Sequence, residues 1–275
     1  MSVRLVAIDL DGTLIGSDLK ISDADRGAIA RVVAAGIHVV LATGRLFAAS
    51  RPFASDLGLR GPLAALQGGV IYDLDSGELL HVVPLRPAIA LAAYDVLRAR
   101  AYDLQLYFGD TLYLDHSSAA SDEYLRLARV EPVMVPDLRV LLTGAAPPGA
   151  LIKLLAIGAP DAVVRDLPLL SGQLGLHANV CRSLPQYLEV TDPAADKGHA
   201  LVRMAGILGV ALSECAAIGD SDNDVPMFRV AAESYAVANA TDAAKKAAMR
   251  VVAVRGAGVA EALALVSKGD ACGRA

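Results

Sequence analysis

Two carboxylates lie two residues apart near the start of the chain. Asp9 and Asp11 directly follow the mostly apolar segment Val3–Ile8, and Gly12 comes next. An apolar, β-branched run of this length predicts a strand that is buried on both faces. A carboxylate at the end of such a strand is costly to desolvate unless it is paired or binds a metal. We therefore predict a functional site here, the alternative being a turn that happens to be acidic.

Further polar groups stand at the ends of other predicted elements. A second apolar strand at 37–42 is followed by Thr43, and Lys197 begins a predicted helix. A strand at 215–218 is followed by an acidic segment, Gly219-Asp220-Ser221-Asp222-Asn223-Asp224. The carboxyl ends of parallel strands meet at one edge of a sheet, where open α/β folds bind their ligands. We expect these polar groups to converge on Asp9 and Asp11.

The elements that must position these groups alternate between strand and helix in two parts of the chain. Ser22 is a predicted N-cap of the first helix, and Leu63–Leu66 is predicted as a third strand of the sheet. Strands separated by helices of this length predict a parallel sheet with right-handed crossovers. From about Pro84 the pattern changes to hairpins, with strands at 103–108 and 111–114 joined at Gly109-Asp110.

The expected fold class is α/β: a three-layer, parallel-sheet (Rossmann-like) core with an inserted α+β domain. Residues 1–83 and 186–275 form the expected discontinuous catalytic core, and residues 84–185 form the expected insert. A net charge of -5 argues against a nucleic-acid partner. Apolar runs stop before the ~18 residues of a membrane span, and the first residues lead straight into a strand, leaving no room for a signal peptide. The cysteines, at 181, 215 and 272, lack metal-ligand spacing. We expect a cytoplasmic protein.

The motifs together carry a family resemblance. They are similar to the four motifs of the haloacid-dehalogenase-like superfamily, most of all to its Cof-type phosphatases: Asp9-Leu10-Asp11-Gly12-Thr13, Leu41-Ala42-Thr43-Gly44-Arg45, Lys197-Gly198 and Gly219-Asp220-Ser221-Asp222-Asn223-Asp224. The gap between the second and third motifs is long enough for an inserted domain, which resembles the placement of a type 2B cap. One departure is Gln67-Gly68-Gly69, where such proteins usually have Asn-Gly-Ala.

The resemblance implies specific roles for the first two carboxylates. Asp9 would be the nucleophile that takes up a phosphoryl group as an aspartyl-phosphate. Asp11 would act as general acid toward the leaving alkoxide and then as general base toward water.

The resemblance also implies a Mg²⁺ cofactor. The carboxylates of the motifs offer the oxygen ligands that Mg²⁺ prefers. Asp9, the Asp11 carbonyl and Asp220 would be the protein ligands, with Asp224 orienting a metal-bound water or Lys197. The groups expected to contact the phosphoryl group or substrate are Gly12, Thr43, Gly44, Arg45, Lys197 and Asn223. For Arg45 the alternative is an ion pair with a carboxylate.

The function implied is Mg²⁺-dependent hydrolysis of a small phosphomonoester, such as a sugar phosphate, with the insert acting as a lid that selects the leaving group. One alternative is a phosphomutase of the phosphomannomutase type. Another is a ligand-binding regulator without catalysis, which predicts the loss of Asp9, Asp11, Lys197 or Asp220, and all four are present. The expected partner is a small phosphate ester, with neither nucleic acid nor membrane, and the chain is expected to be a monomer or a homodimer.

Overall fold

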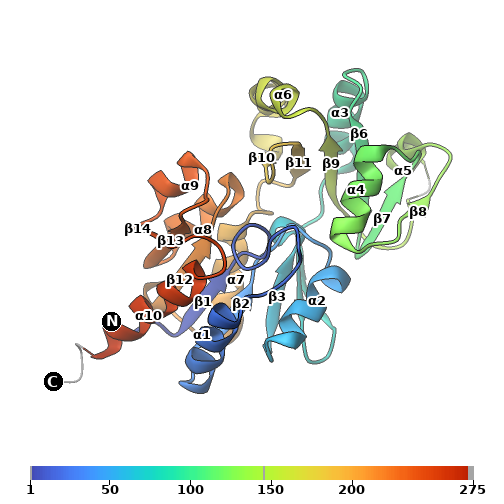
Figure 1. The fold of residues 1–275 in the computed structure, drawn as a ribbon. Coiled ribbons are helices and arrows are strands. Elements are labelled where there is room, and N and C mark those ends of the chain that lie inside the picture. Colours follow the sequence, from blue (N-terminus) through green and yellow to red (C-terminus); the bar gives the residue numbers. More distant parts are fainter. Residues whose placement is uncertain (1, 145, 272–275) are drawn as a thin grey trace.

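The structure, a computed structural model, describes residues 2–144 and 146–271, so Cys272 lies outside the described residues. Two lobes are visible in Figure 1: a core lobe built from the first and last parts of the described residues, and a cap lobe built from the part between them. Within the described residues no helix is both long and apolar enough to cross a membrane.

A parallel sheet forms the centre of the core lobe. Its strands are, in spatial order, β14 (Arg250–Val252), β13 (Glu233–Val237), β12 (Cys215–Gly219), β1 (Leu5–Ile8) and β2 (His38–Leu41). All of its neighbouring pairs are parallel, and every residue of β1 is buried. The predicted α/β core with a parallel sheet is confirmed.

Helices cover both faces of this sheet and complete three layers (Figure 1). On one side α1 packs against α10, and on the other α7 packs against α8. The core-lobe helices are α1 (Asp23–Ala34), α2 (Phe47–Asp56), α7 (Lys197–Leu208), α8 (Val225–Val230), α9 (Asp242–Ala247) and α10 (Gly258–Ala271). Local signals set several of their ends: the Ser22 hydroxyl accepts from Asp25 N at 3.0 Å, as an N-cap does.

The prediction of a third parallel strand at Leu63–Leu66 is corrected by the structure. The strand β3 (Pro62–Ala65) belongs to a separate antiparallel sheet with β4 (Val70–Asp73) and β5 (Leu79–Val82). A single parallel bridge, between Ala42 and Ala64, joins β3 to the end of β2. The turn after β3 sends the chain directly back as β4, so no crossover helix follows and the parallel sheet ends at β2.

The cap lobe contains the second large sheet. Its order is β10 (Asn179–Arg182), β11 (Tyr187–Thr191), β9 (Leu151–Ile157), β6 (Asp103–Phe108), β7 (Thr111–Leu114) and β8 (Val133–Met134), antiparallel except for the β7–β8 pair. Its helices are α3 (Pro87–Arg98), α4 (Ala119–Ala128), α5 (Leu138–Thr143) and α6 (Pro160–Leu174). Since β11 belongs to this sheet, the cap lobe extends to Thr191, past the expected boundary at 185.

Both faces of the cap sheet are buried at its central strands, β6, β9 and β11, whereas β10 is half-buried and β8 is exposed. One face packs against α3, α5 and α6 through residues such as Leu104 and Leu154. The other face, including Tyr107 and Leu155, belongs to the same hydrophobic cluster as the core lobe. The two lobes are therefore held together by apolar packing as well as by the polar contacts described below.

A histidine in the cap lobe makes the stability of that lobe depend on pH. His116 lies between two carboxylates, with Nδ1 2.6 Å from Asp115 and Nε2 2.9 Å from Asp103. Hydrogen bonds to Asp103 and Asp115 raise the pKa of His116, so the folded state favours its charged form. This stabilisation is fully present below the unfolded pKa of about 6.5 and is lost as the pH rises through the folded pKa. We expect the Tm difference between wild type and His116→Gln to be larger at pH 6 than at pH 9. An equal difference at both pH values would contradict this assignment.

Candidate active site

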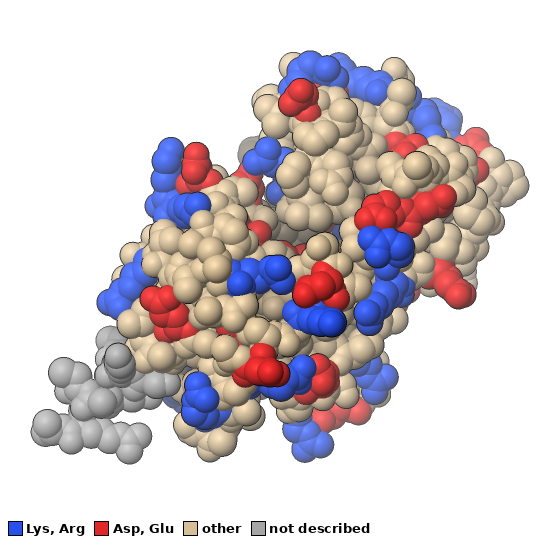
Figure 2. Space-filling view, in the orientation of Figure 1, with Lys and Arg blue, Asp and Glu red and all other residues tan. Residues whose placement is uncertain are grey.

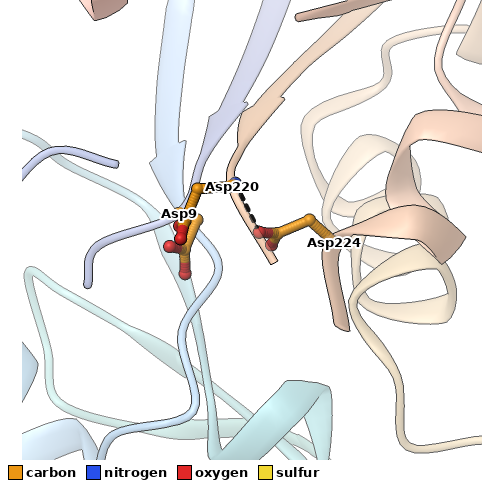
Figure 3. Close-up of side chains that lie close together, drawn as sticks. All are labelled: Asp9, Asp220 and Asp224. Carbon is orange, nitrogen blue, oxygen red and sulfur yellow. Dashed lines mark hydrogen bonds between the residues drawn. The ribbon is translucent and has the colours of Figure 1, made fainter. Parts of the chain in front are cut away.

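The carboxyl edge of the parallel sheet brings together the groups that the sequence separates. Asp9 follows β1, Asp220 follows β12, and Lys197 opens α7. Asp224 ends the short 3₁₀ helix Asp222–Asp224, directly before α8. Figure 3 shows Asp9, Asp220 and Asp224 side by side, with Asp224 turned back toward the main chain of Asp220. The structure shows the expected convergence at this edge for Asp9, Lys197, Asp220 and Asp224.

Lys197 is the cation of this cluster. Its Nζ lies 2.5 Å from Asp9 Oδ1 and 2.6 Å from Asp224 Oδ1, and its side chain is 1% exposed. Burial alone would lower the pKa of Lys197, but Asp224 and Asp9 outweigh this and raise it. Lys197 is therefore a permanent positive charge beside the carboxylate of Asp9.

Main-chain and hydroxyl groups hold the remaining carboxylates in place. Asp220 accepts hydrogen bonds from Thr13 Oγ1 at 2.8 Å and from Ser221 Oγ at 2.9 Å. Asp224 Oδ2 accepts from the backbone N–H groups of Asp220 and Ser221, at 2.8 and 2.9 Å. Both oxygens of Asp224 are thus engaged, one by Lys197 and the other by the loop, and its supporting role toward a metal remains a prediction.

Two glycines leave the space that these carboxylates occupy. Gly12 has a φ of +88°, and a Cβ built on it would lie 2.5 Å from Asp220 Oδ2. A Cβ on Gly219 would lie 2.5 Å from the carboxyl carbon of Asp224. Any larger residue at either position would displace a carboxylate of the site.

The acidic cluster fits a divalent cation with oxygen ligands. Within the described residues, Asp9, Asp220 and Asp224 each offer a carboxylate oxygen, and these atoms all lie within 4.8 Å of one another. Burial and the neighbouring carboxylates raise the pKa of Asp9, although Lys197 opposes this. Burial and Asp224 raise the pKa of Asp220. Three carboxylates facing a single lysine leave an excess of two negative charges, which a divalent cation would neutralise.

Asp11 lies outside this carboxylate cluster because its side chain pairs with Arg45. Arg45 Nε lies 2.7 Å from Asp11 Oδ2, and Nη2 lies 2.6 Å from Oδ1. The third guanidinium nitrogen donates to the Leu127 carbonyl of the cap lobe at 2.9 Å. Of the two expectations for Arg45, the structure shows the ion pair with a carboxylate. The predicted metal contact through the Asp11 carbonyl remains a prediction.

The other expected substrate contacts differ in their placement. Asn223 Nδ2 donates to Gln67 Oε1 at 2.9 Å, and a Cβ on Gly44 would lie 2.6 Å from Gln67 Nε2. The longer Gln67 side chain thus fills the space beside Gly44 and binds Asn223. Thr43 is fully buried, and its Oγ1 accepts from Arg45 N at 3.2 Å. Gly44 and Asn223 line the cavity described next, and Thr43 does not.

A cavity of about 280 Å³ lies between the two lobes over Asp9 and Asp11. The space-filling view shows the surface hollowed where the lobes meet (Figure 2). From the core lobe come Asp9, Asp11, Gly12, Leu19, Gly44, Arg45, Gln67 and Asn223; from the cap lobe come Tyr124, Leu127, Lys153, Leu184, Tyr187 and Glu189. The cavity is therefore acidic and polar at its core end and largely apolar at its cap end.

Of these residues, sequence reasoning named Lys153 as a polar cap residue that could line the closed site, and it missed Glu189 and Leu127. Lys153 and Glu189 form a buried ion pair at 3.0 Å, and Lys153 Nζ donates to the Gly44 carbonyl at 2.8 Å. A charged residue inside the apolar strand β9 was the available signal for Lys153, because buried charges are rare unless paired. Tyr124 and Leu127 carried no such signal, since apolar residues at helical spacing are typical of a core.

Comparisons with known proteins agree with this geometry. Residues 6–263 match the family model of the haloacid dehalogenase-like hydrolases. An HMP-PP phosphatase of Cronobacter sakazakii is 28% identical over 237 residues, covering 86% of this chain and 85% of its own. The pyridoxal phosphate phosphatase YbhA of Escherichia coli is 26% identical over 260 residues, covering 92% and 94%.

A solved structure shows the same likeness in three dimensions. A haloacid dehalogenase-like hydrolase from Bacteroides thetaiotaomicron superimposes with a TM-score of 0.80 at 28% identity, covering 96% of this chain and all of its own. The family model covers both lobes and every motif at the sheet edge. The chain therefore belongs to the haloacid dehalogenase-like hydrolase family, and its curated relatives are phosphatases.

Proposed function

We propose that the chain is a Mg²⁺-dependent phosphatase that hydrolyses small phosphomonoesters through an aspartyl-phosphate on Asp9. The observation that carries the proposal is the arrangement at the cavity floor. There, one carboxylate lies beside a buried lysine and within an acidic cluster, and a second carboxylate stands two residues away. Family membership supports hydrolysis, and the named phosphatases among the relatives support a phosphate ester as substrate.

In the first half-reaction, a carboxylate oxygen of Asp9 attacks phosphorus and the bond from phosphorus to the leaving oxygen breaks. Asp11 supplies the proton that the leaving oxygen takes up. Because Arg45 donates to both oxygens of Asp11, one of these hydrogen bonds must be released before Asp11 can hold that proton.

In the second half-reaction, water attacks the phosphorus of the aspartyl-phosphate and gives its proton to Asp11. The bond to Asp9 breaks and inorganic phosphate leaves. In this step Asp11 is a base, and its pairing with Arg45 suits the carboxylate form.

Positive charge and N–H groups at the sheet edge stabilise the transferring phosphoryl group. Lys197 is the fixed cation beside Asp9, and Asn223, Thr43 and the amides near Gly12 and Gly44 supply further donors. Asp9, Asp220 and the Asp11 carbonyl would hold Mg²⁺, with Asp224 in support, and the ion would neutralise charge on the phosphoryl oxygens.

The cap lobe, which we propose as a domain inserted between the two parts of the core, selects the leaving group. Its side of the cavity combines apolar side chains, such as Leu184 and Tyr187, with the Lys153–Glu189 pair. This mixture suits a small, polar metabolite with a carbon skeleton, such as a sugar phosphate. The two curated relatives above are named for different substrates at similar identity, so the substrate must depend on residues outside the shared motifs.

The test is phosphate release from a panel of phosphorylated metabolites that includes sugar phosphates, pyridoxal phosphate and nucleotides. We expect turnover of small phosphomonoesters with Mg²⁺ and no other addition. A protein that transfers phosphate only with a bisphosphate activator, and releases little of it, would instead be a phosphomutase. Absence of turnover across the panel would contradict the proposal.

Leu184 offers a test of leaving-group selection by the cap lobe. Leu184→Asn removes apolar surface from the cavity wall, so it should lower kcat/KM most for the leaving groups that are least polar. We expect the ratio of kcat/KM for pyridoxal phosphate to that for glucose 6-phosphate to fall about tenfold. The control is Leu176→Asn, because Leu176 is on the same lobe and is 94% exposed. If both variants leave the ratio unchanged, the cavity wall at Leu184 does not select the leaving group.

A further inference from the structure

The cap lobe contacts one short segment of the core lobe at three separate points. We call this segment, Gly44–Ala48, the docking strip. Lys153 of β9 donates to the Gly44 carbonyl at 2.8 Å, and the Leu127 carbonyl of α4 accepts from Arg45 at 2.9 Å. Asp110, in the turn between β6 and β7, accepts hydrogen bonds from the other end of the strip. Three elements of the cap lobe thus meet on five residues that adjoin the active site.

Asp110 supplies an N-cap to a helix of the other lobe. Its Oδ1 accepts from Phe47 N at 2.7 Å and its Oδ2 from Ala48 N at 2.9 Å, the first two residues of α2. The helix's own N-cap residue, Leu46, has no side-chain hydrogen bond to offer. The free N–H groups and the positive end of the helix are therefore satisfied by Asp110 only while the lobes are docked.

The docking strip leads directly to the acid/base carboxylate. Arg45 immediately precedes the N-cap Leu46, and it binds both oxygens of Asp11. Phe47 stacks on Tyr72 with ring centroids 4.4 Å apart, which anchors the first turn of α2 in the core lobe. Any shift of this first turn would move the main chain of Arg45 and with it the guanidinium that holds Asp11.

We propose that Asp110 is a positioning residue for the phosphatase reaction: it holds the cap lobe closed on the first turn of α2 and thereby keeps Arg45 on Asp11. The inference rests on the proposed function. Asp110 touches neither Asp9 nor the acidic cluster, and it acts through the docking strip. Loss of its carboxylate favours the open arrangement of the lobes, in which the substrate cavity is incomplete.

The test is Asp110→Ala in the full chain. If only the closed protein binds substrate well, the apparent affinity falls in proportion to the closed fraction. We expect KM to rise about 2- to 30-fold, the factor that corresponds to the loss of an N-cap, with kcat nearly unchanged because saturating substrate still closes the lobes. We also expect small-angle X-ray scattering to show a larger radius of gyration for the substrate-free variant than for wild type.

Two further variants separate positioning from simple destabilisation. Asp137 caps α5 inside the cap lobe, where its Oδ1 accepts from Arg139 N at 2.8 Å. Asp137→Ala therefore removes a cap without touching the docking strip, and it should lower Tm while leaving KM and the radius of gyration as in wild type. Asp110→Asn retains an oxygen that can cap a helix, so its KM should lie much closer to that of wild type than to that of Asp110→Ala.

The inference and the proposed function fail in different ways. An Asp110→Ala protein with unchanged KM and radius of gyration would overturn the positioning role, as would a fall in kcat at constant KM. A wild-type protein that hydrolyses no phosphate ester would overturn the proposed function, and the scattering comparison would still decide whether Asp110 closes the lobes.

Discussion

Asp9→Asn should abolish turnover, and Asp11→Asn should slow it by about 10²–10⁴-fold, the usual scale of general acid–base catalysis. An amide at position 9 cannot take up a phosphoryl group, so no aspartyl-phosphate can form. An amide at position 11 still leaves the nucleophile, Lys197 and the acidic cluster in place, so a slow reaction remains. The measurement is steady-state phosphate release, with trapping of acid-stable phosphoenzyme as a second readout.

The Tm of each variant distinguishes a loss of catalysis from a loss of the fold. Burial among neighbouring carboxylates raises the pKa of Asp9, so removing its charge relieves a desolvation cost in the folded state. We expect the Tm of Asp9→Asn not to fall below that of wild type. Asp222→Asn is the matched control, because Asp222 follows a neighbouring strand of the same sheet but binds Thr241 and Arg182 instead of joining the acidic cluster. Near-normal turnover by Asp9→Asn would show that the nucleophile has been wrongly assigned.

Removal of divalent metal should also abolish activity. Excess chelator leaves two uncompensated negative charges at the sheet edge, where the phosphoryl group of the substrate must bind. Added Mg²⁺ should restore activity. Ca²⁺ should bind and support little turnover, because its looser coordination lets a carboxylate bind through both oxygens and disturbs the line of attack.

A thermal shift measures metal binding without turnover. A ligand that binds only the folded state stabilises it, so Mg²⁺ should raise the Tm of wild type. Asp220→Asn should lose both this shift and the activity, whereas Asp222→Asn should keep both. Full activity in excess chelator, or an unchanged thermal shift in Asp220→Asn, would contradict the assignment of the metal site.

Much of the core could be predicted from the sequence because its signals are local. Apolar runs identified β1, β2 and β12, and the polar residues directly after them marked the sheet edge at which Asp9 and Asp220 meet. Parallel pairing then follows from the strand–helix alternation, so convergence of the motifs required no knowledge of side-chain packing.

Elements whose signals depend on packing were predicted less well. The alanine-rich helix α3 was not identified, and β3 was assigned to the wrong sheet. A short apolar strand has the same composition in a parallel or an antiparallel sheet, and only its pairing with β4 distinguishes the two. That β11 belongs to the cap sheet could not be read locally either, because it pairs with its neighbour β10 and also with β9, which is distant in sequence.

The sequence by itself determined the chemistry at the sheet edge: the nucleophile candidate Asp9, the acid/base candidate Asp11, the cation Lys197 and the acidic residues after β12. These are residue types at the ends of locally encoded strands, so their meeting follows from the topology. The tertiary structure alone decided the side-chain contacts around this edge. That Arg45 binds Asp11, that Gln67 holds Asn223, and that Asp110 caps α2 depend on side chains up to 156 residues apart in the chain. Such contacts leave no periodic trace in the sequence, because each depends on how separately encoded elements pack, within the core lobe for the first two and between the lobes for Asp110.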